Sequence, residues 1–219
     1  ILSNWETNIK KLNIENLITR LDASRGTNRL RSNEDANPET KPTNISKTKP
    51  DSRNELIPAA VLVLIIIRND GLQVLLTKRN ENLKHHAGQI SFPGGRVEDS
   101  DRNVQHTALR ETEEEVGLKP ALIKIIGELD QYIVGTGYLV SPIIGVIEPP
   151  FELVKQEGEV AEIFEAPLDF LISPENFKRY SRNFNGKTHY HFAITWENHF
   201  IWGATAGMLR NLSDRLLNQ

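Results

Sequence analysis

The fold of this chain depends most on GGRVEDSD at residues 94–101 and on ALRETEEEVGL at residues 108–118. The glycine pair predicts a turn, and the acidic residues after it predict the first turn of a helix. We expect this helix to span about residues 101–116, with its cap among residues 99–101. Gly117 follows the last helical residue and predicts where the helix ends.

The predicted helix carries four carboxylates within five residues. Residues three and four apart are neighbours on a helix, so Glu111, Glu114 and Glu115 form one cluster while Glu113 points away. Three carboxylates at such close range repel one another. The pattern therefore predicts a positive group among them, for which Arg110 is one candidate and a divalent cation is the better one.

The composition sets limits on the architecture and on the partners. With 219 residues, of which 38% are apolar, the chain can bury one core. The net charge of -3 gives no general attraction to nucleic acid or to an anionic membrane, and neither is expected as a partner. The absence of cysteine excludes disulfides and zinc–thiolate sites and suits a reducing compartment. The longest apolar run is much shorter than the ~20 residues of a membrane span.

The first 56 residues differ in composition from the rest. Residues 4–22 have apolar side chains at roughly helical spacing, with Asn4 as a candidate cap, and predict a helix. Residues 24–55 are rich in Asn, Ser, Thr, Lys and Pro and predict a linker or poorly ordered arm. We therefore divide the chain into an appendage, residues 1–56, that docks on the main domain or on the partner in a possible homodimer, and a folded domain, residues 57–219.

The folded domain begins with a continuous apolar run, Ala59 to Ile67, that predicts a strand buried on both faces. Asn69-Asp70-Gly71 is a hairpin signal, and it predicts a return strand over residues 73–78. Further predicted strands lie at residues 90–92, 122–129, 138–147, 159–164 and 189–196, and predicted helices lie at residues 167–172 and 204–217. Phe200 and Trp202 are expected in the core. Strands with separated helices predict an α/β fold, in which one mixed sheet is sandwiched between helices.

The sequence around the acidic helix resembles the box of the Nudix hydrolases. That box runs Gly, five residues, Glu, seven residues, then Arg-Glu-apolar-any-Glu-Glu-any-Gly-apolar, and residues 110–118 supply its second half. Asp101 stands in for the first Glu, and Thr112 stands where an aliphatic residue is usual. The interval from Gly95 to Arg110 is one residue longer than the general spacing.

The longer interval is similar to that of the subgroup that hydrolyses coenzyme A and its thioesters. The signature of this subgroup before the box is Leu-Leu-Thr-any-Arg, a small residue, three others, Arg, three more, Gly, three more and Phe-Pro-Gly-Gly. This chain has residues 75–80, Lys84, Gly88 and residues 92–95 in the matching places. Asn80 replaces the small residue, and Lys84 replaces the arginine, which keeps the charge but loses bidentate phosphate geometry. Residues 201–206 also look like bacterial members of the subgroup.

The resemblance implies the Nudix fold and a metal-dependent hydrolase with Mg2+ or Mn2+ as cofactor and coenzyme A or an acyl-CoA as small-molecule substrate. Water would attack one phosphorus of the diphosphate, giving adenosine 3',5'-bisphosphate and (acyl-)4'-phosphopantetheine. Two alternatives stay open: a Nudix hydrolase of another nucleoside diphosphate derivative (a dinucleotide, nucleotide sugar or oxidised nucleotide), and a non-catalytic Nudix-fold ligand-binding module. Similar enzymes include peroxisomal ones, but the end at Gln219 is not a Ser-Lys-Leu-type address, so we expect a bacterial-like cytoplasmic protein.

A diphosphate linkage repels a nucleophilic water, so its hydrolysis needs cations to neutralise the charge and a base to activate the water. Mg2+ and Mn2+ prefer oxygen ligands, which the glutamates of the box offer. By resemblance, Glu111 and Glu115 are the main metal ligands and Glu114 contributes to a further ion. The carbonyl of Gly94 or Gly95 is expected to complete the site.

Other roles follow from the same resemblance. Arg110 is implied to orient a glutamate rather than to touch the substrate. The general base is either Glu111 or a glutamate of a later loop, Glu157, Glu159 or Glu162. Among the later three we favour Glu159, because it follows a glycine at a strand entrance.

Substrate contacts are expected from Arg79, Lys84, Gly95 and Arg96. Arg79 and Lys84 are placed to meet the phosphates of an anionic substrate through charge-assisted hydrogen bonds. Residues 135–138 (GTGY) predict a flexible lip over the site.

Overall fold

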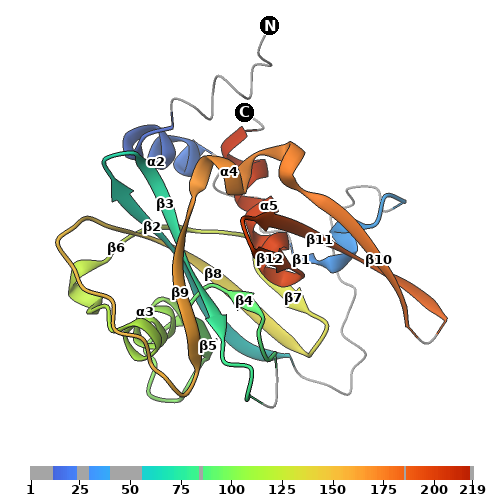
Figure 1. Ribbon diagram of the computed structural model, residues 1–219, viewed down its shortest axis with the longest axis horizontal. Helices are drawn as coiled ribbons and strands as arrows, with labels where there is room; N and C mark the ends of the chain where they lie inside the picture. The colour runs from blue at the N-terminus through green and yellow to red at the C-terminus, as the bar shows by residue number, and fades with distance from the viewer. Residues whose placement is uncertain (1–11, 24–29, 40–55, 84–85, 185, 218–219) are drawn as a thin grey trace, which may run out of the picture.

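Figure 1 shows a large twisted sheet with helices on both faces and a smaller sheet beside it. The computed structural model describes residues 12–23, 30–39, 56–83, 86–184 and 186–217. These residues form a nine-stranded mixed sheet, in which β1-β7-β8-β2-β3-β4 are neighbours in that order, and a three-stranded antiparallel sheet, β10-β11-β12. No helix of these segments has the length and apolar character needed to cross a membrane.

The centre of the large sheet is β2 (Ile57–Arg68), the strand predicted from the apolar run. It pairs in parallel with β8 (Tyr138–Ile147) and antiparallel with β3 (Gly71–Arg79), to which the predicted hairpin turn connects it. Alternate side chains of β2 enter two separate apolar clusters, because successive residues of a strand point to opposite faces. The prediction of a strand buried on both faces is confirmed.

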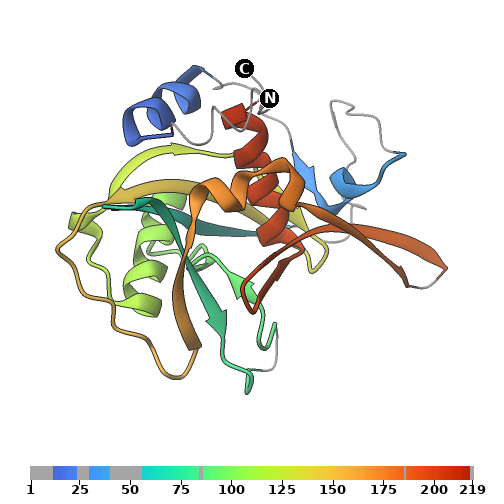
Figure 2. The same ribbon diagram turned by 45° about the horizontal axis from the view of Figure 1, so that its top comes forward.

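Each apolar cluster is covered by helices. On one face lies α3 (Val104–Val116), and on the other lie α2 (Ile14–Ala23), α4 (Leu168–Ile172) and α5 (Ala204–Leu217). Figure 2 shows α5 and α2 together on the side of the sheet away from α3. The predicted α/β architecture of a mixed sheet between helices is therefore confirmed.

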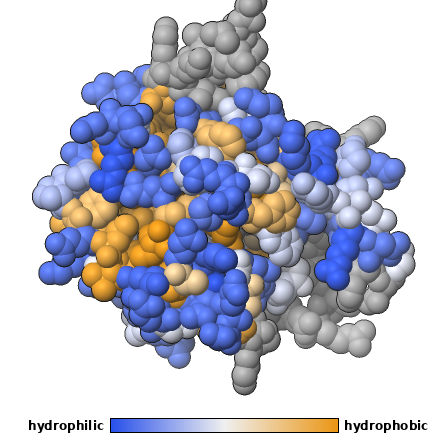
Figure 3. All heavy atoms as spheres, in the orientation of Figure 1, coloured by the Kyte–Doolittle hydropathy of each residue, from blue (hydrophilic) through white to orange (hydrophobic). Residues whose placement is uncertain are grey.

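The remaining strands complete the large sheet and form the small one. They are β4 (Ile90–Ser91), β5 (Gly94–Arg96), β6 (Lys124–Glu128), β7 (Tyr132–Val134), β9 (Val160–Pro167), β10 (Lys178–Phe184), β11 (Lys187–Trp196) and β12 (His199–Trp202), with 3-10 turns at η2 (Pro120–Leu122) and η3 (Pro174–Asn176). In the space-filling view most of the surface is hydrophilic, and apolar residues are visible mainly around β9 and the segment before it (Figure 3).

The stretch predicted as a linker contains ordered structure. Within it, β1 (Arg31–Ser32) pairs in parallel with β7, and η1 (Asn33–Ala36) follows directly. Arg31 Nε donates to Asp130 Oδ2 at 3.1 Å, and Ala36 is fully buried. The amino-acid composition did not reveal this segment, because it is held against β7 and Asp130 by backbone and ionic contacts rather than by large apolar side chains. The division at residue 57 stays a prediction, and residues 4–11 of the predicted first helix lie outside the described segments.

Two expectations about single residues were wrong. The cap of α3 is Asn103, whose Oδ1 accepts from His106 N at 2.8 Å, and not one of residues 99–101. Phe200 and Trp202 are 44% and 37% exposed, whereas Ile201 between them is fully buried. Because side chains alternate along β12, a core position for Ile201 turns both neighbours outward.

Candidate active site

The helix α3 packs directly against the glycine pair. An added Cβ at Gly95 would lie 2.3 Å from Glu111 Oε1, and one at Gly94 would lie 2.4 Å from the carbonyl oxygen of Ala60. Gly94 and Gly95 belong to β5, which pairs with β2. The glycine pair thus lies in a short strand and not in the predicted turn, and both glycines are needed because this strand is pressed between β2 and a carboxylate of the helix.

Arg110 holds Glu111 and Glu114 in place. Its Nη1 donates to Glu111 Oε1 at 3.0 Å and to Glu114 Oε2 at 3.2 Å. Its Nε and Nη2 donate to Asp101 Oδ1 and Oδ2 at 3.1 and 3.0 Å, and Nη2 also donates to the carbonyl of Arg96 at 3.1 Å. The guanidinium is thus bound on every side by protein oxygens, as expected for an arginine that orients a glutamate.

Asp101 anchors this arginine from the turn before the helix. Its carboxylate is fully buried and also accepts from Thr107 Oγ1 and from the backbone N of Glu98, at 2.8 and 3.0 Å. The hydrogen bonds from Arg110 hold the pKa of Asp101 far below its usual range, and those from Glu98 and Thr107 act in the same direction. The residue that replaces the first Glu of the box is therefore an ionised structural anchor.

Glu115 is the most perturbed carboxylate of the site. It is only 4% exposed, and its Oε2 has no hydrogen-bond partner within the described segments. Burial raises its pKa to about 8, and the charges of Glu111 and Glu159 act in the same direction, whereas the charge of Arg79 and the Gly94 N–H lower it. Burial also raises the pKa of Glu111. A buried, uncompensated carboxylate beside a second one is suited to a divalent cation.

The carboxylates are not gathered as the helical spacing suggested. No three carboxylates or imidazoles of the described residues are close enough together to form a ready-made metal-binding group. Glu114 has a 58% exposed side chain that turns to Arg110, while the charge of Glu159 acts on both Glu111 and Glu115. Among the three later glutamates, Glu159, in the loop before β9, is thus the one whose charge acts on the pKa of both Glu111 and Glu115.

The other two candidate bases, Glu157 and Glu162, have different partners, and Glu162 lies in β9 rather than in the loop. Glu157 forms an ion pair with Lys155 at 3.2 Å, and Glu162 contacts His199 at 3.1 Å. Asn80 attaches this loop to the end of β3: its backbone N donates to the carbonyl of Glu159 at 2.8 Å, and its Nδ2 donates to that of Glu157 at 3.1 Å. The departure from a small residue at position 80 thus has a structural role that the sequence did not reveal.

The expected substrate residues lie in different surroundings. Arg79 is half-buried near Glu115, and its Nε lacks a hydrogen-bond partner in the part of the chain that is described. Arg96 is exposed, with its guanidinium carbon 5.3 Å from the ring centre of Tyr138 and its Nε donating to the hydroxyl at 2.9 Å. Tyr138 of the predicted lip is thus the partner of Arg96. Lys84 lies outside the described residues.

Known proteins share this sequence pattern. A family model described as NUDIX domain matches residues 58–184. A protein from Escherichia coli O7:K1, described as "Uncharacterized Nudix hydrolase NudL", is 38% identical over 154 residues, which cover 70% of this chain and 80% of that protein. The protein of the same description from Shigella boydii serotype 4 has the same identity and coverage.

Solved structures of low sequence identity were also found. The binary complex of a C. elegans Ap4A hydrolase has a TM-score of 0.45 and 19% identity, covering 51% of this chain and 80% of that chain. RenU, a Nudix hydrolase from M. smegmatis, has a TM-score of 0.44 and 22% identity, covering 52% of this chain and 71% of that chain.

Proposed function

The chain belongs to the Nudix family, as a hydrolase of a nucleoside diphosphate derivative, and from this premise we propose coenzyme A or an acyl-CoA as its substrate. The products are adenosine 3',5'-bisphosphate and (acyl-)4'-phosphopantetheine. The observation that carries this choice is the run of residues 75–95, which resembles the signature of coenzyme A-hydrolysing members at all its defined positions except Asn80 and Lys84. The added residue between Gly95 and Arg110 supports the same subgroup.

Nudix hydrolases generally use divalent metal ions, and we assign Mg2+ or Mn2+ to Glu111 and Glu115, with the Gly94 carbonyl as a further ligand and Glu114 serving a second ion. The support is the buried Oε2 of Glu115, which no protein donor satisfies within the described segments. When bound, such an ion neutralises charge on the diphosphate and lowers the pKa of a water.

The side chains of the chain itself perform the remaining tasks. Arg110 Nη1 donates a hydrogen bond to Glu111 Oε1 at 3.0 Å. Because this carboxylate oxygen already accepts a hydrogen bond, it is poorly placed to take a proton from water. Glu159 faces the same cluster from a loop, and we assign it as the base that removes a proton from the attacking water. Arg79, Lys84, Gly95 and Arg96 are assigned to the substrate, with the arginines on its phosphates.

Asn80 and Lys84 depart from the signature of the coenzyme A-hydrolysing subgroup, and these departures favour a second candidate function of the same class, the hydrolysis of dinucleotides or nucleotide sugars. The two are separated by incubating the full chain with Mg2+ or Mn2+ and equal amounts of CoA, acetyl-CoA, 3'-dephospho-CoA, ADP-ribose and a diadenosine polyphosphate, and by identifying products by chromatography. We expect CoA or acetyl-CoA to give the highest kcat/KM. Consumption of ADP-ribose or of the dinucleotide, with CoA left intact, would refute the proposal that coenzyme A is the substrate.

The assignment of the base has a matched control in the same loop. Glu159→Gln should lower kcat on the order of 100-fold or more, because the water loses its proton acceptor. Glu157→Gln, which removes only an exposed ion pair with Lys155, should leave kcat within about twofold. Equal effects of the two substitutions would return the role of base to Glu111.

A further inference from the structure

A cavity that includes no residue of the acidic helix is lined by three arginines. It has a volume of about 270 Å3 and lies between the β1–η1 segment, β10, β11 and α5, on the face of the sheet opposite to α3. Arg31, Arg179 and Arg210 line it, together with Asp35 and Asp214. Its wall includes the segment that composition alone predicted as a linker.

One carboxylate serves two of these arginines. Asp214 accepts from Arg31 Nη1 at 3.2 Å and from Arg210 Nε at 2.9 Å. Asp35 accepts from the backbone N of Ser32 at 3.3 Å as part of the cap of η1. Arg31 is also paired with the buried Asp130, whose Oδ2 lies 3.1 Å from its Nε, so the charge of Arg31 is compensated by two aspartates and the arginines left to bind an anion are Arg179 and Arg210.

Two guanidinium groups converge on one buried ring. The guanidinium carbons of Arg179 and Arg210 each lie 5.9 Å from the ring centre of Phe192, which is only 7% exposed. Among the described residues no carboxylate pairs with Arg179. Two like charges over the same ring repel each other, and an anion between them converts this repulsion into attraction on both sides.

We propose that this cavity binds the phosphate group of a small phosphorylated molecule through Arg179 and Arg210. Arginine is suited to this ligand, because its planar donors match phosphate oxygens in pairs. The volume is close to the lower limit for small-molecule sites, which suits a phosphate monoester better than a large cofactor. This site is separate from the proposed substrate site and does not depend on the hydrolytic activity.

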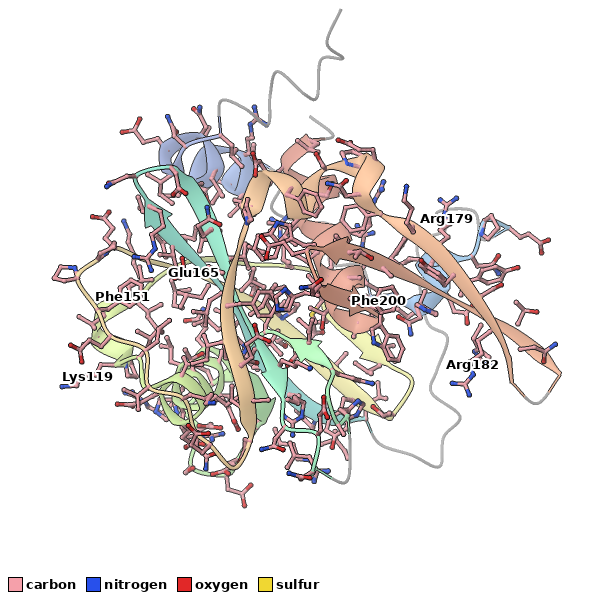
Figure 4. All side chains as sticks on the ribbon, viewed as in Figure 1. Lys119, Phe151, Glu165, Arg179, Arg182 and Phe200 are labelled. Atoms are coloured by element: carbon pink, nitrogen blue, oxygen red, sulfur yellow. The ribbon has the colours of Figure 1, made fainter. Side chains whose placement is uncertain are left out.

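The sharpest test compares Arg179 with Arg182 of the same strand. They are an odd number of residues apart and point to opposite faces of β10, so that only Arg179 lines the cavity (Figure 4). Because phosphate could also bind Arg79 at the proposed active site, every protein used in this binding test would be the full chain with Arg79→Gln. Inorganic phosphate would be titrated without divalent cation at constant ionic strength, by calorimetry and by the amide resonance of Gly207, which lines the cavity.

We expect saturable phosphate binding that Arg179→Gln weakens at least tenfold, with a shift of the Gly207 resonance that this substitution abolishes. Arg182→Gln should change the affinity less than twofold, and Arg179→Lys should recover part of the loss, since it restores the charge without the paired donors. No saturable binding, or equal losses in the Arg179→Gln and Arg182→Gln proteins, overturns the proposal. In phosphate-free buffer, turnover by Arg179→Gln in an otherwise unaltered chain should equal that of the parent.

Discussion

Replacement of Glu115 by Gln should make the metal-free protein more stable at alkaline pH while removing its metal-dependent turnover. Glu115 is buried, and its pKa in the folded protein is raised from 4.5 to about 8. The folded state therefore keeps a proton that the unfolded state releases, so the unfolding free energy falls as the pH rises from 4.5 to about 8 and levels off above it.

The expected size follows from the same pKa values. A slope of about 1.4 kcal/mol per pH unit over this interval gives a loss of about 4 to 5 kcal/mol for the parent chain at pH 9. Glu115→Gln, which cannot ionise, lacks this loss. It should be more stable than the parent by a few kcal/mol at pH 9 and nearly equal to it at pH 4.

Urea unfolding in EDTA at intervals between pH 4 and pH 9 measures this difference, with Glu113→Gln as the control because Glu113 is exposed on the same helix. Mg2+ should stabilise the parent and release protons near pH 7, whereas it should do neither for Glu115→Gln. If the unfolding free energies of the parent and of Glu115→Gln changed in parallel with pH, the prediction would be refuted, since folding would then not shift the pKa of Glu115.

Three substitutions test the supports of the site. Gly95→Ala forces Glu111 aside and should lower kcat on the order of 100-fold, with little change in the urea midpoint, because the clash is with a flexible side chain. Gly94→Ala clashes with the backbone of β2 and should lower the urea midpoint strongly. Asp101→Asn should cost about 3 kcal/mol of unfolding free energy at pH 7, because Arg110 loses a buried ionic partner. This difference should shrink in acid, as the parent Asp101 becomes protonated.

The sequence predicted the central elements because their patterns are local. The end of α3 at Gly117, the strand from residue 138 to 147 and the helix from residue 204 to 217 agree with the structure residue for residue. Each is fixed by a continuous apolar run, a helical period or a glycine with positive φ. Such signals need no knowledge of what the segment packs against.

The elements that the sequence analysis missed have weak or competing local patterns. The strand β10 (KRYSRNF) has no clear apolar face, because it is stabilised by pairing with β11. Asn103 was overlooked as the cap because the acidic residues before it gave an equally good local pattern, and Asp101 was already committed to Arg110. The proximity of Glu159 to Glu111 and Glu115 is likewise a product of tertiary structure, and in the sequence it was one of three similar glutamates.

Arg110 uses all five of its N–H donors on protein oxygens of Asp101, Glu111, Glu114 and Arg96. The orientation of Glu111 is consequently set before any substrate arrives and is the same for every substrate. Chemistry and selectivity are then separate properties of this chain. Under the proposed assignment, residues at the ends of β3 and β8 can change to suit a different diphosphate, while the carboxylates of α3 keep their places.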